Sequence, residues 1–147
     1  MTGPTAELRD LARQLFAYET RANGNPVDVA DAMGAVGERL YVRLERLIAV
    51  AGFHALLRRA VRLAQEDYAW LAEVRVEEQP RCSLIGLREA ADGRDQSETS
   101  EAFVAVVANV LWLLVIFIGE DLTLSLVLQT WPALRDEPLD TKDQGYE

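Results

Sequence analysis

Apolar residues recur three or four positions apart along almost the whole chain. This spacing predicts a first helix within residues 4–22, a second over 27–51 and a third over 53–74. The Asn-Gly and Asn-Pro pairs at 23–26 are turn-forming and separate the first helix from the second. Because no alternating strand pattern runs for any length, the sequence predicts an all-α fold.

The most apolar stretch runs from Ala102 to Trp131 and is interrupted only at residues 119–121. Its uninterrupted part, 102–118, would be roughly 25 Å long as a helix, whereas a bilayer core is about 30 Å thick. The stretch contains two acids and neither lysine nor arginine, so nothing in it would orient a membrane span. We interpret it as a central helix buried by the others, with a subunit interface or a transmembrane span as alternatives.

Two segments lack a regular pattern. Residues 75–100 are predicted to be an irregular connection containing a short strand or a single helical turn, and the acidic residues 134–147 a disordered tail. The sequence thus predicts one domain over residues 1–133, a bundle of four to five helices with a long, mostly buried C-terminal helix.

Amino-acid composition indicates in which compartment the protein works and which covalent cross-links it can form. Half of the 147 residues are hydrophobic, which is enough for a core without a metal or a disulfide. The lone cysteine, Cys82, excludes an internal disulfide, and no secretory leader is recognisable at the N-terminus. These features favour a cytoplasmic protein, and the excess of arginine and alanine suggests a GC-rich bacterial genome.

Catalytic motifs are absent from the sequence. The single histidine, His54, cannot supply the two Glu-x-x-His pairs of a di-metal bundle or an H-E-x-x-H zinc site. Neither a G-x-S-x-G elbow nor a phosphate-binding glycine loop is present, and Arg81 is the only sequence neighbour that could activate Cys82. We therefore expect no enzymatic activity, no cofactor and no metal.

Positive charge is concentrated in one region of an acidic chain. Residues 38–62 carry +4, whereas the remainder carries −13. Six arginines form this candidate docking patch for an acidic partner or a phosphate group: Arg39, Arg43, Arg46, Arg58, Arg59 and Arg62. The alternative is that they pair with acids of the bundle. Nucleic-acid binding is disfavoured, because the whole protein is acidic and has a single lysine.

Polar residues inside the apolar stretch are the other candidates. Asn109 and Glu120 are eleven residues apart, about three helical turns, and would share one face of a continuous helix. They could form a buried anchor, with an arginine pairing with Glu120, or hold a ligand. Asp121, Ser125 and Gln129 lie four residues apart and predict a solvent-facing stripe.

Large aromatic side chains could fill the core, line a pocket or form an interface; the candidates are Phe53, Trp70, Trp112, Phe117 and Trp131. The leading functional hypothesis is a non-enzymatic interaction or adaptor module that self-associates, with a dimer favoured, or docks onto a partner protein. The alternatives are a sensor that binds an apolar ligand between helices and a membrane-associated protein attached through residues 102–131.

Overall fold

The computed structural model describes residues 3–21, 29–77 and 83–136, and helices form most of this part. The elements in chain order are α1 (Ala6–Thr20), α2 (Val29–Leu44), α3 (Val50–Ala64), η2 (Ala69–Glu73), β1 (Arg75–Glu77), β2 (Ser83–Ile85), α4 (Leu87–Ala91), α5 (Gln96–Ile118), α6 (Glu120–Thr130) and α7 (Ala133–Asp136). Within the described residues, five of these helices have eleven residues or more. The predicted all-α bundle is confirmed.

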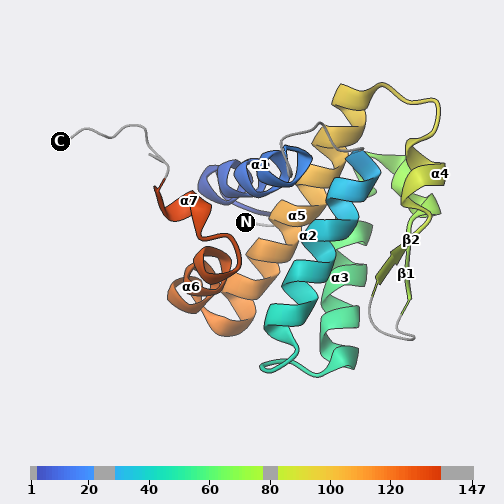
Figure 1. Cartoon of the computed structure of the whole chain (residues 1–147). Helices are drawn as coiled ribbons and strands as arrows, with labels where there is room; N and C mark the ends of the chain where they lie inside the picture. The colour runs from blue at the N-terminus through green and yellow to red at the C-terminus, as the bar shows by residue number, and fades with distance from the viewer. Residues whose placement is uncertain (1–2, 22–28, 78–82, 137–147) are drawn as a thin grey trace.

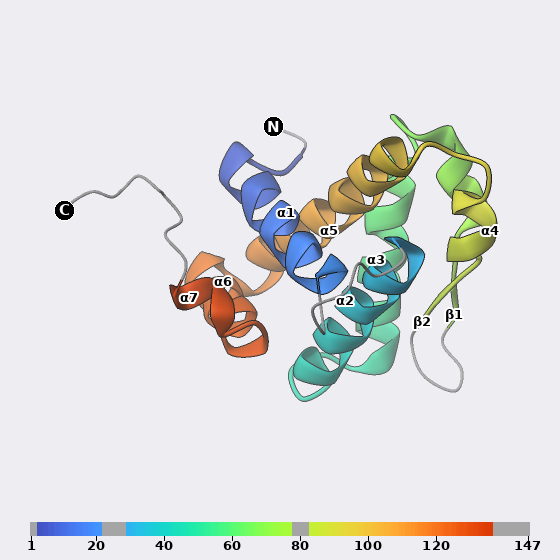
Figure 2. The same ribbon diagram turned by 45° about the horizontal axis from the view of Figure 1, so that its top comes forward.

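The long helix α5 lies at the centre, packed against α1 and α3 and also touching α2 and α6 (Figures 1 and 2). Asp95 caps it, since its side chain accepts a hydrogen bond from the backbone N–H of Glu98. From Ala102 to Leu114 most of its side chains are buried. The prediction of a long, mostly buried helix near the C-terminus therefore holds for this part of the stretch.

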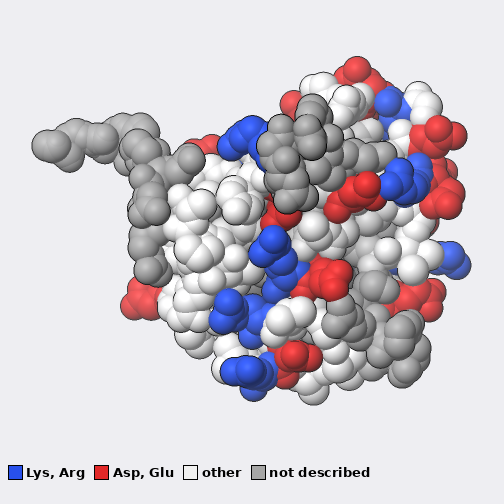
Figure 3. Space-filling view, in the orientation of Figure 1, with Lys and Arg blue, Asp and Glu red and all other residues white. Residues whose placement is uncertain are grey.

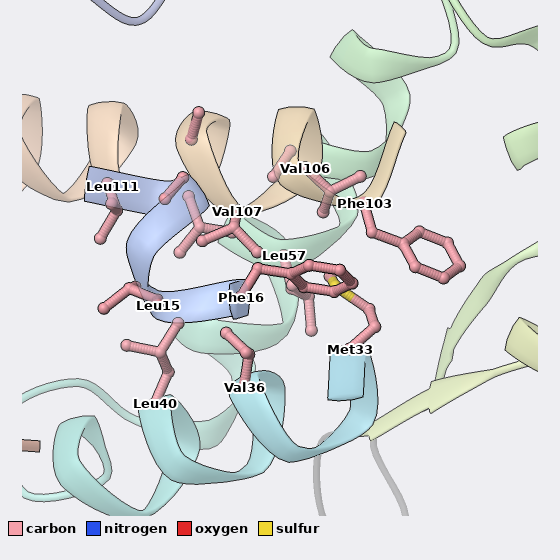
Figure 4. Close-up of a cluster of buried hydrophobic side chains, with 14 of the residues drawn as sticks. Leu15, Phe16, Met33, Val36, Leu40, Leu57, Phe103, Val106, Val107 and Leu111 are labelled. Carbon is pink, nitrogen blue, oxygen red and sulfur yellow. The ribbon is translucent and has the colours of Figure 1, made fainter. Parts of the chain in front are cut away.

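Side chains from α1, α2, α3 and α5 meet in the core (Figure 4). The labelled members are Leu15, Phe16, Met33, Val36, Leu40, Leu57, Phe103, Val106, Val107 and Leu111, all buried. The rings of Phe16 and Phe103 meet edge-on, with centroids 6.4 Å apart. Burial of this apolar surface is the main contribution that holds α1, α2 and α3 around α5.

The apolar stretch does not form one continuous helix, so this expectation was wrong. Helix α5 ends at Ile118, and α6 begins at Glu120 after Gly119, whose φ of 94° is strongly disfavoured for other residues. Glu120 and Asp121 then occupy the first turn of α6, where negative charge is favourable. The chain changes direction at this glycine, and α6 packs back against α5.

The boundary between the second and third helices also differs from the prediction. Helix α2 ends at Leu44, and α3 already begins at Val50. Gly52, which falls between the two predicted ranges, lies inside α3, where a Cβ would come within 2.7 Å of a methyl group of Ile48. The absence of a side chain at Gly52 lets the buried Ile48 fold underneath the first turn of α3.

After α3 ends at Ala64, the chain forms η2 and a two-stranded antiparallel sheet in which Val76 pairs with Leu84. Gly86, with a φ of 89°, lets the chain pass close to η2, because a Cβ there would be 2.6 Å from the carbonyl oxygen of Glu73. The segment predicted as an irregular connection therefore contains β1, β2, α4 and the first turn of α5. Cys82, Arg81 and residues 137–147 of the expected tail lie outside the described residues.

Candidate functional site

Asn109 is buried between helices, as predicted for a polar anchor. Its Nδ2 atom donates a hydrogen bond to the carbonyl oxygen of Ala60, 3.1 Å away on α3. Ala60 is fully buried, so no solvent competes for this contact. A hydrogen bond of this kind contributes about 1 kcal/mol and fixes the axial register of α5 against α3.

Glu120 does not share that environment, so the expectation of a buried Glu120 was wrong. Its side chain is exposed in the first turn of α6, and no arginine of the described part pairs with it. The break at Gly119 removes the continuous helix on which the shared face depended. Asp121, Ser125 and Gln129 are exposed as expected, and the Nε2 atom of Gln129 donates to Ser125 Oγ at 3.2 Å.

A buried glutamate that sequence reasoning missed joins three elements. Glu19, which is 3% exposed, accepts a hydrogen bond from Trp131 Nε1 at 2.8 Å and pairs with Arg39 Nε at 2.6 Å. Trp131 is fully buried just after α6. The network ties α1, α2 and the end of α6 together. The available signal was the position of Glu19, four residues after Leu15 on the apolar face of α1.

The six arginines of the predicted patch do not share one surface: four border two separate hollows, and Arg46 and Arg59 are exposed outside both. Arg39 and Arg43 border a shallow groove of about 380 Å³ between α2 and α6. Arg43 donates to the carbonyl oxygen of Gln129 at 3.3 Å, and Arg39 binds Glu19. Figure 3 shows basic side chains in a row along α2, beside a largely uncharged surface over α6. These two arginines therefore make contacts within the bundle.

Arg58 and Arg62 instead face the strand β1. Together with Arg75 they line a hollow of about 310 Å³ between α3 and β1. His54 attaches the strand to the helix, because its Nε2 atom lies 3.1 Å from the carbonyl oxygen of Val76 and must carry the proton to donate to it. Sequence reasoning did not group Arg75 with the patch, since it lies in the segment that had no regular pattern.

The five candidate aromatics lie in different surroundings and do not line one common pocket. Phe53 and Trp131 are core residues, and Phe53 meets Tyr41 edge-on. Trp70 is partly buried between Phe103 and the guanidinium of Arg94, which lies 4.6 Å from its ring centroid. Trp112 is half-buried on α5, whereas Phe117 is in solvent.

Apolar side chains are exposed where α5 meets α6. Ile116 is 64% exposed, Phe117 67% and Leu122 43%, and these three define the apolar end. The half-buried Trp112, Leu113, Val115 and Ile118 belong to the same part of α5. Exposed apolar side chains that gather in one region can mark an interaction site, so the apolar end is a candidate interface.

A tyrosine lines a groove at the opposite end of α5. Tyr68, Arg9, Phe16 and Glu101 are among the residues around this hollow of about 550 Å³ between α1 and α5. Burial, and then the negative charges of Glu101 and Asp67, raise the pKa of Tyr68 above its usual value. Its hydroxyl group is therefore protonated at neutral pH.

Two further features concern a membrane span and a metal site. Gln96–Ile118 is apolar and long enough to cross a membrane, but half of its most apolar window is buried among the other helices. Among the described residues, no three histidine, cysteine or acidic side chains gather in a way that could hold a metal ion.

No protein-family model, curated protein or solved structure matches this chain.

Proposed function

We propose that this chain is a non-enzymatic interaction module that forms a symmetric dimer through its apolar end. The observation that carries the proposal is the exposure of Ile116, Phe117 and Leu122 on both sides of the break at Gly119. Burying large apolar side chains contributes roughly 1.5–3 kcal/mol each, which is the kind of gain that drives association.

A protein surface suits this end better than a lipid surface. Glu120 and Asp121 lie between Phe117 and Leu122 in the chain and are exposed. Between Arg94 and Arg135 the sequence has neither lysine nor arginine. Membrane surfaces are negative and attract basic residues, so acids in this position oppose membrane attachment.

The charges around α6 favour a second copy as the partner. The acids are at the start of α6, whereas Arg43 contacts Gln129 near its end. These two positions are about 12 Å apart along the helix. If the α6 helices of two copies pack antiparallel, the acids of each copy lie beside Arg43 of the other, as a two-fold axis requires.

Sedimentation equilibrium with a charge swap tests this arrangement. We expect the wild-type chain to dimerise and both Asp121→Arg and Arg43→Asp to weaken the dimer about tenfold, because each places like charges together. The double variant should recover most of the affinity. The proposal would be refuted by a wild-type chain that stays monomeric. It would also be refuted by a double variant whose loss of dimer affinity equals the sum of the losses in the two single variants.

A further inference from the structure

Three arginines from two elements surround one hollow at the opposite side of the molecule from α6 (Figure 1). Arg58 and Arg62 are one helical turn apart on α3, and Arg75 is the first residue of β1. All three are exposed, and the buried Val61 and Val74 also line the hollow. The three arginines therefore lie around a small depression with apolar residues among its walls.

The fold holds these elements together by specific contacts. The hydrogen bond from His54 to the carbonyl oxygen of Val76 fixes β1 against α3. Val76 in turn pairs with Leu84 of β2, and Gly86 allows the end of the hairpin to approach η2 closely. Arg75 is thus held opposite Arg58 and Arg62 by the backbone of the hairpin.

Ion pairs among the described residues do not balance the charge of this cluster. Within the described part of the chain, no carboxylate lies within 4 Å of the guanidinium nitrogens of these three arginines, whereas Arg39 pairs with Glu19. Glu77 also lines the hollow, without forming such a pair. Like charges gathered in one place repel each other, and a bound anion would offset this repulsion.

We propose that this hollow, the arginine site, binds a phosphate group of a small ligand. Guanidinium groups bind phosphate through two parallel hydrogen bonds, and three of them can contact different oxygens of one dianion. The volume of about 310 Å³ is at the low end for ligand pockets, which suits one phosphate group with a short substituent. The Gln65 side chain, also in the lining, can donate a further hydrogen bond.

Isothermal titration calorimetry of the full-length chain with inorganic phosphate tests the site. We expect binding to wild type and a loss of about 100-fold in affinity for the Arg58→Gln/Arg62→Gln double variant, because each lost charged hydrogen bond costs about tenfold. The matched control is Arg46→Gln/Arg59→Gln, which removes the same charge from exposed positions that do not line the hollow. It should change the affinity by less than about threefold, because neither side chain lines the hollow and exposed charges are screened by solvent and salt.

Equal losses in the two double variants would overturn the proposal, because they would show only an effect of overall charge. Equal binding of citrate would overturn the assignment to phosphate. The thermal unfolding temperature of each variant without phosphate shows whether its fold is intact. Since the site is separate from the apolar end, its failure would leave the proposed dimer unaffected, and the mass of the Arg58→Gln/Arg62→Gln variant should match that of wild type.

Discussion

The two ends of the apolar segment of α5, residues 102–118, have similar composition and opposite surroundings. From Ala102 to Leu114 the helix is enclosed by α1, α2 and α3, and Asn109 bonds to α3. Beyond Leu114 the helix is less covered: Val115 and Ile118 are half-buried, and Ile116 and Phe117 remain exposed. The comparison teaches that apolar character along a helix does not by itself say which part is core and which part is open to a partner.

The difference arises at Gly119, where the chain turns. Leu126 and Val127 of α6 are buried against the bundle, so α6 covers part of the outer end of α5 and leaves Phe117 outside. The hydrogen bond between Trp131 and Glu19 then fastens the end of α6 to α1. The apolar end is consequently a feature of how α6 is placed, and the predictions below test each part of that placement.

The largest expected effect separates the two ends directly. Phe103→Ala should lower the free energy of unfolding by about 3–5 kcal/mol, because a fully packed ring leaves a cavity. Phe117→Ala should change the stability of the monomer by less than about 0.5 kcal/mol, because its ring is already in solvent. Urea denaturation at low protein concentration measures both, and similar losses would contradict the difference between the ends.

The second largest loss of stability is expected when the attachment of α6 to the bundle is removed. Glu19→Ala should cost about 2–3 kcal/mol, since it leaves the buried N–H of Trp131 without its acceptor and Arg39 without its partner. Glu7→Ala, at an exposed position of the same helix, is the matched control and should change stability by less than about 0.5 kcal/mol. Near-equal values from thermal or urea unfolding would show that the network does not hold α6.

Replacing Asn109 tests whether its hydrogen bond fixes the register of α5 against α3. Asn109→Ala should cost about 1–2 kcal/mol, because it removes the hydrogen bond to Ala60 and leaves a small void. Gln129→Ala removes an exposed amide from α6 and should be nearly neutral in the same unfolding assay. If Asn109→Ala were also neutral, the bond between α5 and α3 would have no role in stability.

The smallest effect concerns Tyr68 beside the enclosed end. Because its pKa is raised in the folded chain, folding retains a proton that the unfolded chain releases near pH 10. The contribution of Tyr68 to the free energy of unfolding is fully present below pH 10. It is lost as the pH rises through the higher pKa that Tyr68 has in the folded chain. We expect stability to fall less steeply above pH 10 in Tyr68→Phe than in wild type, and identical slopes would contradict the assigned burial.

The sequence predicted the helical fold well because apolar spacing is a local signal. It correctly placed Asp121, Ser125 and Gln129 in solvent and Asn109 inside. It missed the break at Gly119, since an apolar run on both sides of a glycine is equally compatible with one helix or two.

The candidate sites depended on contacts that the sequence does not specify. The pairing of Glu19 with Arg39 and Trp131 joins residues far apart in the chain, and the division of the arginines depends on which neighbours α2 and α3 have. Arg75 joined Arg58 and Arg62 only because a short hairpin packs against α3. Such groupings follow from tertiary packing, which overrides local pattern.

Light scattering after size-exclusion chromatography tests the central claim most directly. At concentrations where the wild-type chain has twice the monomer mass, Phe117→Ser should be a monomer. Ile85→Ser, which removes an exposed apolar side chain from β2 on the far side of the bundle, should remain a dimer. A wild-type monomer at every concentration, or a Phe117→Ser dimer as tight as wild type, would contradict the assignment of the apolar end as the interface.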